Sequence, residues 1–235
     1  MQEPHVIYED NDFLAINKPA GMLVDQVRAL GKLLPEHREE TLAGWLEKKI
    51  PSAKLVHRLD KDTSGIILAA KTPAYFDYFK LLFRERLIKK TYLALVAGKF
   101  KKKTGVINAP IGIKQGMIRH TTHEPRRPTE AITEYKVVGE FIADEKPISL
   151  LEVYPKTGRT HQIRVHLNSI HRPVVGDPLY GGISVSTLGA SRQMLHAQSL
   201  EFILKDGGRI KLEANAPDDF NRIVNHLAAA SRNAS

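Results

Sequence analysis

The apolar residues of this chain occur in short segments separated by turn residues, a pattern typical of β-strands. The first two segments flank an acidic turn at residues 9–12 and predict a β-hairpin. The segments predicted as strands are 6–8, 13–16, 55–59, 66–70, 91–96, 131–141 and 148–153. Two more strands are predicted around the turn Asp206-Gly207-Gly208.

Four other segments combine helical spacing of their apolar residues with residues that start helices. Helices are predicted at residues 41–50 and 72–87, each beginning with a threonine that can cap it. A third helix is expected after Thr160 as its cap, and a fourth from about Pro217. Strands outnumber helices in this pattern.

Because the strands are many and the turns short, we predict an α+β fold with a mainly antiparallel, mixed β-sheet core and flanking helices. The chain has no internal repeat and no linker-like stretch that would divide it. Residues 1–235 are therefore expected to form a single domain.

The 35 Lys and Arg residues exceed the 26 Asp and Glu residues, which gives a formal net charge of +9. This excess favours a polyanionic partner such as nucleic acid, because cations that neutralise phosphates release condensed counterions. A generally basic surface without that role is the alternative. Residues 114–128 have few apolar side chains and predict a basic loop. Its basic residues and histidines are Lys114, Arg119, His120, His123, Arg126 and Arg127.

The absence of cysteine excludes a disulfide scaffold, a cysteine nucleophile and a thiolate metal site. The first residues lack the basic and apolar regions of a signal peptide. No apolar run approaches the ~20 residues that cross a bilayer. We therefore expect a soluble, cytoplasmic protein without membrane association.

The first motif with chemical potential is Asp60-Lys61-Asp62-Thr63-Ser64-Gly65, which matches the opening of a calcium-binding loop. Its twelfth position should be a bidentate Glu but is Lys71, and its flanks are predicted strands, so calcium binding is not supported. Asp60 then ends a predicted strand, with Arg58 on the same side of it. A structural salt bridge and an active-site carboxylate both fit, and spacing alone favours the salt bridge.

The second motif, residues 157–167, leads from a loop into the third predicted helix. Its apolar residues Ile163 and Leu167, together with Ile170, follow helical spacing and should face the core. The opposite polar stripe consists of His161, Arg164, Asn168 and His171. The histidines at 161, 166 and 171 are five residues apart and point in different directions, so no metal site is expected. A solvated helix face would not explain why His, Gln and Arg crowd the first turn.

The third motif is Lys89-Lys90-Thr91-Tyr92. Tyr92 can be an ordinary residue at a strand edge. It can also stack on a nucleic-acid base while the two lysines contact phosphates.

Taken together, these stretches resemble the RluA-type family of pseudouridine synthases. The resembling segments are 17–21, 57–60 with 63–65 and 70–71, 90–92, 157–164, 195–197 with Leu200 and Phe202, and 216–220. They occur in family order and extend from about residue 5 to residue 225. The resemblance implies the pseudouridine synthase catalytic fold.

The resemblance also implies an isomerase that converts specific uridines of tRNA or rRNA to pseudouridine, with Asp60 as its catalytic residue. Arg164 matches the Arg that pairs with the catalytic carboxylate, and Tyr92 matches the residue that stacks on the target base. Ile163 would pack on the other side of that base. Arg58 would fill the gap left by the flipped nucleotide, and His57 beside it would also contact substrate.

Further implications concern partners. The residues expected to bind RNA are Lys89, Lys90, Arg119, Arg126 and Arg127. No water is consumed in this isomerisation, and neither a metal nor an organic cofactor is implied. The chain is expected to act as a monomer on RNA, with no obligatory protein partner.

Two departures from the family pattern affect RNA binding. Some relatives carry a small S4-like RNA-binding domain before the catalytic one. Here the first family strand begins by Val6, so RNA binding is expected within the catalytic domain. The family often has Gly-Lys where this chain has residues 127–131, a segment that borders the RNA in relatives, so substrate choice does not follow by analogy.

Two other functions remain open. A non-catalytic RNA-binding protein on the same fold would be marked by loss of Asp60 or Arg164, and both are present. A nucleoside hydrolase or base-excising glycosylase would need a second carboxylate to activate water, for which Asp62 and Asp177 are the candidates.

Overall fold

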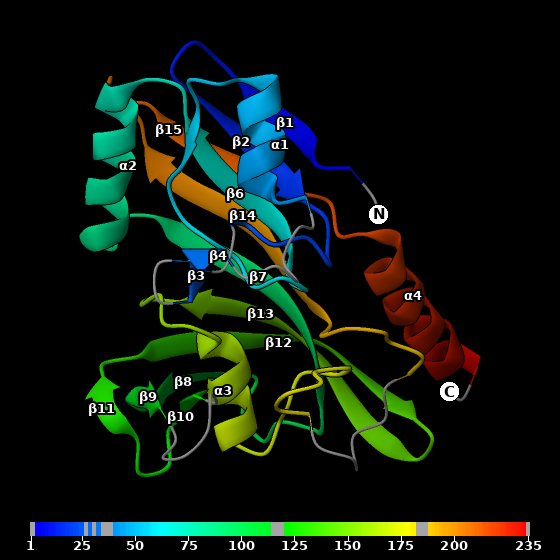
Figure 1. Cartoon of the computed structure of the whole chain (residues 1–235). Coiled ribbons are helices and arrows are strands. Elements are labelled where there is room, and N and C mark those ends of the chain that lie inside the picture. The colour runs from blue at the N-terminus through cyan, green and yellow to red at the C-terminus, as the bar shows by residue number, and fades with distance from the viewer. Residues whose placement is uncertain are drawn as a thin grey trace. The chain divides into compact units, whose positions relative to one another are not determined.

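The computed structural model describes residues 3–25, 28–29, 32–33, 40–113, 120–181 and 188–233. The chain forms two compact units (Figure 1). Unit 1 consists of residues 1–88 and 197–215, and unit 2 consists of residues 89–196 and 216–235. Within the described residues, no helix has the length and apolar character to span a membrane.

Unit 1 is a mainly antiparallel sheet with two helices. Its strands follow the order β1-β2-β6-β14, with β5 also paired to β6 and β15 to β14. The strands are β1 (His5–Glu9), β2 (Phe13–Lys18), β5 (Lys54–Leu55), β6 (Ser64–Ala70), β14 (Leu195–Ile203) and β15 (Arg209–Glu213). A separate two-stranded sheet pairs β3 (Arg28–Ala29) with β4 (Lys32–Leu33). The helices are α1 (Leu42–Lys49) and α2 (Pro73–Arg84).

An aromatic cluster fixes α2 to this sheet. The ring of Phe79 in α2 lies 5.2 Å from Phe13 in β2 and 5.4 Å from Phe202 in β14, with edge-to-face geometry in both pairs. Phe13 and Phe79 are fully buried, and burying one such side chain stabilises the fold by about 1.5–3 kcal/mol. The buried face of α2 is formed by Phe79 and Leu82.

The threonine caps predicted for α1 and α2 are confirmed. Thr41 Oγ1 accepts a hydrogen bond from Gly44 N–H at 3.1 Å, and Thr72 Oγ1 accepts one from Tyr75 N–H at 3.3 Å. Helix α2 ends at Arg84, three residues before its predicted end. The chain turns there because Arg86 adopts a left-handed conformation (φ +60°), which leaves Leu87 exposed.

Unit 2 is also built on an antiparallel sheet, in the order β7-β13-β12-β8. These strands are β7 (Lys89–Ala97), β8 (Thr104–Asn108), β12 (Ile132–Ala143) and β13 (Lys146–Pro155). A small sheet has the order β10-β9-β11, formed by β9 (Ile111–Ile113), β10 (His120–Thr121) and β11 (Arg126–Thr129). The helices are α3 (Gln162–Ser169) and α4 (Asp218–Asn233).

Alternation along the strands separates the two sides of the unit 2 sheet. In β7, Ala94 and Val96 join the apolar cluster that contains Ile163 and Leu167 of α3. The intervening Leu95 joins a different cluster, which contains Phe220 of α4. The two helices therefore cover opposite faces of this sheet (Figure 1).

A buried chain of hydrogen bonds ties α3 to β12. Gln162 Nε2 donates to Thr133 Oγ1 at 3.0 Å, and its Oε1 lies 2.6 Å from Thr157 Oγ1. Thr133 Oγ1 is also 2.8 Å from His166 Nδ1, and His166 Nε2 is 2.9 Å from the Ala109 carbonyl. Since a carbonyl only accepts, Nε2 carries the proton of a neutral His166 and Nδ1 accepts from Thr133. Burial lowers the pKa of His166, against a smaller opposing effect of the Ala109 carbonyl.

Three local predictions were wrong. Of the predicted strand 55–59 only Leu55 lies in a strand, β5, so Arg58 and Asp60 are not on one side of a strand. The predicted basic loop contains β10 and part of β11 in its described portion, because both pair with β9. The N-cap of α3 is His161, not Thr160, and it forms no side-chain capping bond.

Gly65 is predicted to be intolerant of substitution. It has φ +119°, and a Cβ there would lie 2.1 Å from the Ala197 carbonyl oxygen. Gly65→Ala should reduce the free energy of unfolding by at least about 3 kcal/mol, measured by urea denaturation. Gly207→Ala is the matched control, because Gly207 has φ +90° but nothing within 4 Å of its Cβ position. The Gly207→Ala substitution should reduce the free energy of unfolding by only about 1–2 kcal/mol. Equal losses in the two variants would contradict a steric cause at Gly65.

His166 should make unit 2 less stable in mild acid. Its folded pKa lies below the ordinary value of 6.5, so the unfolded chain takes up a proton first as the pH falls through 6.5. His166→Gln keeps a donor for the Ala109 carbonyl but does not titrate. Between about pH 7.5 and about pH 5.5, the wild type should lose up to about 1 kcal/mol more stability than this variant. The control His123→Gln changes an exposed histidine and should lose as much stability as the wild type over this pH range. If His166→Gln loses as much stability as the wild type, His166 is not the origin of the acid sensitivity.

Candidate functional site

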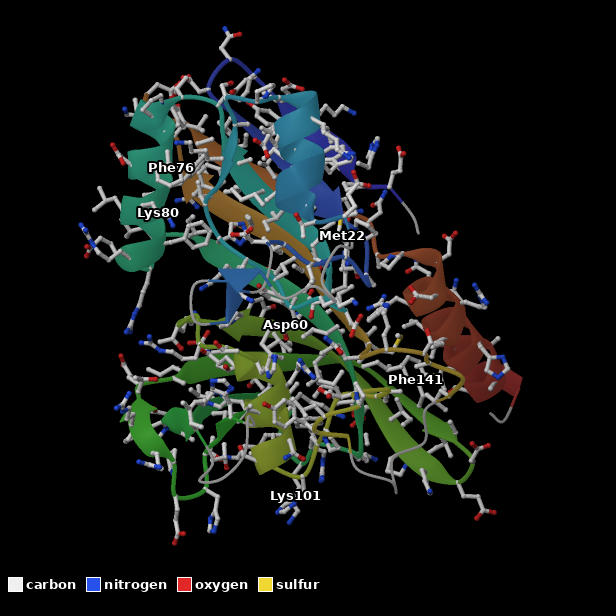
Figure 2. The ribbon with its side chains drawn as sticks, viewed as in Figure 1. Met22, Asp60, Phe76, Lys80, Lys101 and Phe141 are labelled. Atoms are coloured by element: carbon white, nitrogen blue, oxygen red, sulfur yellow. The ribbon has the colours of Figure 1, made fainter. Side chains whose placement is uncertain are left out.

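Asp60 lies in unit 1, in the turn that precedes β6 (Figure 2). Its carbonyl accepts a hydrogen bond from Thr63 N–H at 3.2 Å, which closes the turn 60–63. The Asp60 residue is half-buried, whereas Leu59 before it and Thr63 after it are buried. The carboxylate therefore stands on a short turn anchored at both ends.

A buried lysine fastens this turn to the rest of unit 1. Lys18 has no exposed surface, and its ammonium donates to the carbonyls of Pro19 (2.8 Å), Met22 (2.9 Å) and Lys61 (2.8 Å). Gly21 N–H also donates to the Lys61 carbonyl at 3.0 Å. Because burying an unsatisfied ammonium is very costly, these contacts hold the segment 19–22 and the Asp60 turn together.

His57 supports the segment that leads to Asp60. Its Nε2 accepts the Leu68 N–H at 2.9 Å, and its ring lies 4.6 Å from the ring of Phe83. Neutral His57 therefore carries its proton on Nδ1. Arg58, the next residue, is exposed.

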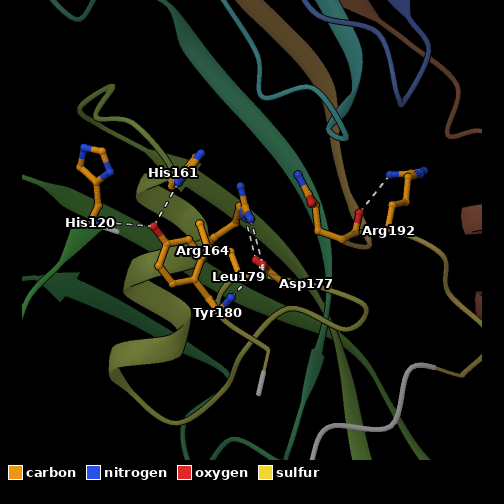
Figure 3. A network of polar contacts seen from close by, with 8 residues as sticks. His120, His161, Arg164, Asp177, Leu179, Tyr180 and Arg192 are labelled. Carbon is orange, nitrogen blue, oxygen red and sulfur yellow. Dashed lines mark hydrogen bonds and ion pairs between the residues drawn. The ribbon is translucent and has the colours of Figure 1, made fainter. Parts of the chain in front are cut away.

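In unit 2, Arg164 forms a buried ion pair with Asp177 (Figure 3). Arg164 Nε lies 2.7 Å from Oδ2 and Nη2 lies 2.8 Å from Oδ1, so the pair is bidentate. Both residues are 5% exposed, so Arg164 does not belong to a solvated face of α3. Burial would raise the pKa of Asp177, but the guanidinium and the N–H groups of Tyr180 and Leu179 outweigh it and lower that pKa.

Tyr180 covers the flat face of this guanidinium. The Arg164 Cζ atom lies 5.1 Å from the centre of the Tyr180 ring. The tyrosine hydroxyl accepts the His120 N–H at 3.3 Å and lies 3.0 Å from His161 Nδ1 (Figure 3). His161 has a left-handed backbone (φ 55°) at the start of α3. The first turn of α3 is thus held by contacts with two other segments of unit 2.

Tyr92 and Ile163 share one apolar cluster of unit 2. Ile163 is buried within it, and Tyr92 of β7 packs against it while remaining partly exposed. Lys90 of the same strand donates to the Thr157 carbonyl at 3.4 Å. The structure therefore brings Tyr92 together with the helix that carries Ile163 and Arg164.

The other predicted site residues are distributed over the surface. Lys89, Arg126 and Arg127 are exposed, and Arg119 lies outside the described residues. Asp60 belongs to unit 1 and Arg164 to unit 2, so their pairing stays a prediction. Among the described residues, no three His, Asp or Glu side chains gather in a way that could hold a metal ion.

Two residues of the site had no assigned role in the sequence interpretation. Lys18 was noted only within the resembling segment 17–21, although a lysine two residues after the apolar run 13–16 is compatible with a satisfied internal cation. Asp177 was named only as a second carboxylate. Its position directly after Gly176 and before Pro178 indicates a turn in which the side chain accepts main-chain N–H groups, and such a side chain is fixed in place.

Comparison with known proteins identifies the family. The family model of RNA pseudouridylate synthase matches residues 12–169, which include Lys18, Asp60 and Arg164. The ribosomal large subunit pseudouridine synthase D of Nitrosomonas europaea is 40% identical over 93% of this chain, which spans 64% of that protein. The synthase of the same name from Pseudomonas aeruginosa is 36% identical over 93% of the chain, which spans 70% of it.

A solved structure agrees with these sequence matches. Human RNA pseudouridylate synthase domain containing 1 matches with a TM-score of 0.79 and 26% sequence identity. The alignment covers 98% of this chain and 95% of the human one. The predicted α+β fold with a mainly antiparallel sheet is confirmed, and this chain belongs to the RNA pseudouridylate synthase family.

Proposed function

We propose that this protein is an RNA pseudouridine synthase that uses Asp60 as its catalytic residue. The observation that carries the proposal is the family match over residues 12–169, which contains an Asp60 turn anchored by Lys18 and a buried, oriented Arg164. These are fixed groups of the kind that stabilise charge in a transition state.

The reaction is an isomerisation in which atoms are only rearranged. The bond from N1 of uracil to C1′ of the ribose breaks, the uracil turns, and C5 bonds to C1′. C5 then loses its proton, and N1 gains one. Positive charge develops at C1′ while the first bond breaks, and the Asp60 carboxylate stabilises it, traps it covalently or removes a ribose proton.

The groups in unit 2 orient the base and the carboxylate in this proposal. Tyr92 stacks on the uracil, and Ile163, from the same apolar cluster, packs on its other side. Arg164 pairs with Asp60 and orients it. Arg58, exposed beside Asp60, fills the place of the flipped nucleotide. We propose that residues 1–235 belong to one catalytic domain.

Large-subunit ribosomal RNA is the proposed substrate. Two of the similar proteins carry ribosomal large subunit pseudouridine synthase in their names. The net charge of +9 suits a polyanion, and Lys89, Arg126 and Arg127 are exposed cations that can contact phosphates. Such contacts offset the few kcal/mol that base flipping costs.

Asp60→Asn should abolish product formation without unfolding the protein. With ribosomal RNA as substrate, the wild type should yield a nucleoside isomer of unchanged mass, and the variant should be slower by at least about 100-fold. Nucleoside chromatography with mass spectrometry measures both. Asp62→Asn removes a neighbouring carboxylate as the matched control and should keep activity.

The same product assay separates the competing functions. Free uracil in place of the isomer would identify a glycosylase. RNA that binds the wild type but is never converted would support a non-catalytic RNA-binding protein. Normal turnover by Asp60→Asn would remove Asp60 from the mechanism.

The exposed arginines of β11 should contribute to RNA affinity through charge. Changing Arg126→Ser and Arg127→Asn together removes two cations, and Asn suits the left-handed conformation of Arg127 (φ 51°). If both contact phosphates, the slope of log affinity against log salt should fall by about 1.4–1.8, measured from about 50 to about 200 mM salt. As a control, Lys54→Ala removes an exposed cation of β5 and should leave this slope unchanged. An unchanged slope in the β11 variant would exclude β11 from the RNA interface.

A further inference from the structure

Asp177 is held in place by its own loop. Its Oδ1 accepts the N–H groups of Leu179 (2.9 Å) and Tyr180 (3.0 Å), and its carbonyl accepts the Gly181 N–H at 2.9 Å. The loop leaves no space for side chains at its ends. A Cβ at Gly176 would lie 2.2 Å from the Arg192 carbonyl oxygen, and one at Gly181 would lie 2.5 Å from that of Asp177. The carboxylate is therefore oriented by the main chain around it.

This oriented carboxylate determines the plane of the Arg164 guanidinium. The two bonds from Nε and Nη2, at 2.7 and 2.8 Å, fix both rotation and tilt, as a single bond could not. The Arg164 and Asp177 side chains are only 6% and 0% exposed, so water cannot replace either partner. The low pKa of Asp177 keeps the pair ionised at neutral pH.

Tyr180 restrains the same group from a second direction. Its ring lies against the guanidinium face at 5.1 Å, and the tyrosine follows Asp177 by three residues in the same loop. The loop 176–181 thus contacts the Arg164 guanidinium at its N–H edge, through Asp177, and on its flat face, through Tyr180. A guanidinium has five N–H groups, so an arginine bound in this way can still donate to a second carboxylate in a fixed direction.

We infer that Asp177 is a positioning residue for pseudouridine formation, which holds Arg164 in the orientation that the reaction requires, with the Tyr180 ring as a brace. This inference rests on the proposed function. Asp177 is not required to touch RNA in this role. Its effect should therefore appear in the rate of the bound complex and not in RNA affinity.

The first test is Asp177→Asn. The amide oxygen can keep the main-chain bonds of the loop, but the amide NH₂ then faces the Arg164 Nε–H donor and breaks the bidentate pair. The single-turnover rate at saturating ribosomal RNA should fall by about 10- to 100-fold, while the dissociation constant for RNA stays within about twofold. An unchanged rate would overturn the inference.

The matched control is Asp219→Asn. Asp219 makes the same kind of bidentate pair with Arg192 in unit 2, at 2.7 and 3.0 Å, but it does not contact α3 through that pair. This variant should keep the rate within about twofold of the wild type. If both variants lose rate equally, general loss of stability explains the effect and the positioning role is wrong.

Coupling to Arg164 is tested in a second background. If Asp177 acts only through Arg164, the double variant Asp177→Asn with Arg164→Gln should be no slower than Arg164→Gln alone. A further loss of similar size in the double variant would contradict this route. Tyr180→Leu, which removes the ring and keeps the ion pair, should lose more rate than Tyr180→Phe, which keeps the ring and removes only the hydroxyl contacts with His120 and His161. These two variants decide the role of the loop if Asp177→Asn does not fold.

A measurement independent of activity separates this inference from the proposed function. In the wild type, the Arg164 Nε–H proton should give an NMR signal that exchanges slowly with water, and Asp177→Asn should lose that signal. If the wild type makes no pseudouridine, the proposed function fails, while loss of the signal still supports the positioning of Arg164. Retention of the signal in Asp177→Asn would overturn the inference.

Discussion

A buried guanidinium needs a fixed anion, and this requirement organises unit 2 around Arg164. An unpaired charge at 5% exposure would reduce the free energy of unfolding, so the ion pair of Arg164 with Asp177 is part of the folded state of unit 2. The loop 176–181 supplies that orientation through its own N–H groups. The direction of Arg164 is consequently determined by folding and does not have to be acquired when RNA binds.

Unit 1 meets the corresponding requirement for its buried cation in a different way. Lys18 is satisfied by main-chain carbonyls from two turns, one of which carries Asp60. Separating the two turns would leave the buried Lys18 ammonium without these carbonyl acceptors. The free energy cost of that state keeps the two turns together. Both units thus place a candidate reactive group on a segment with little freedom. Groups that are oriented in advance stabilise a transition state without reorganisation during the reaction.

Local sequence patterns were sufficient for most elements of the fold. The hairpin β1–β2 and the caps Thr41 and Thr72 depend on neighbouring residues only, and they were predicted correctly. Contacts between distant segments were not accessible in this way. Nothing in the local pattern assigns Asp177 to Arg164, and the left-handed conformation of His161, which moved the cap of α3, accompanies its contact with Tyr180.

In the candidate site, too, the sequence indicated individual residues but not the contacts that they make. Motif resemblance selected Asp60, Tyr92 and Arg164, and the burial of Arg164 excludes a solvated helix face at that residue. The positive charge of a side chain could not show whether that side chain contacts RNA or stabilises the fold. Lys18 serves the fold by contacting main-chain carbonyls, whereas Arg126 is exposed.

The most direct measurement of the central claim is release of tritium from ribosomal RNA labelled at C5 of uracil. Formation of the bond from C5 to C1′ displaces the hydrogen of C5, whereas simple cleavage of the bond from N1 to C1′ leaves it in place. We expect this protein to release tritium in a constant ratio to the pseudouridine formed, with no free uracil. Absence of tritium release from RNA that the protein binds, or labelled free uracil as the product, would contradict it.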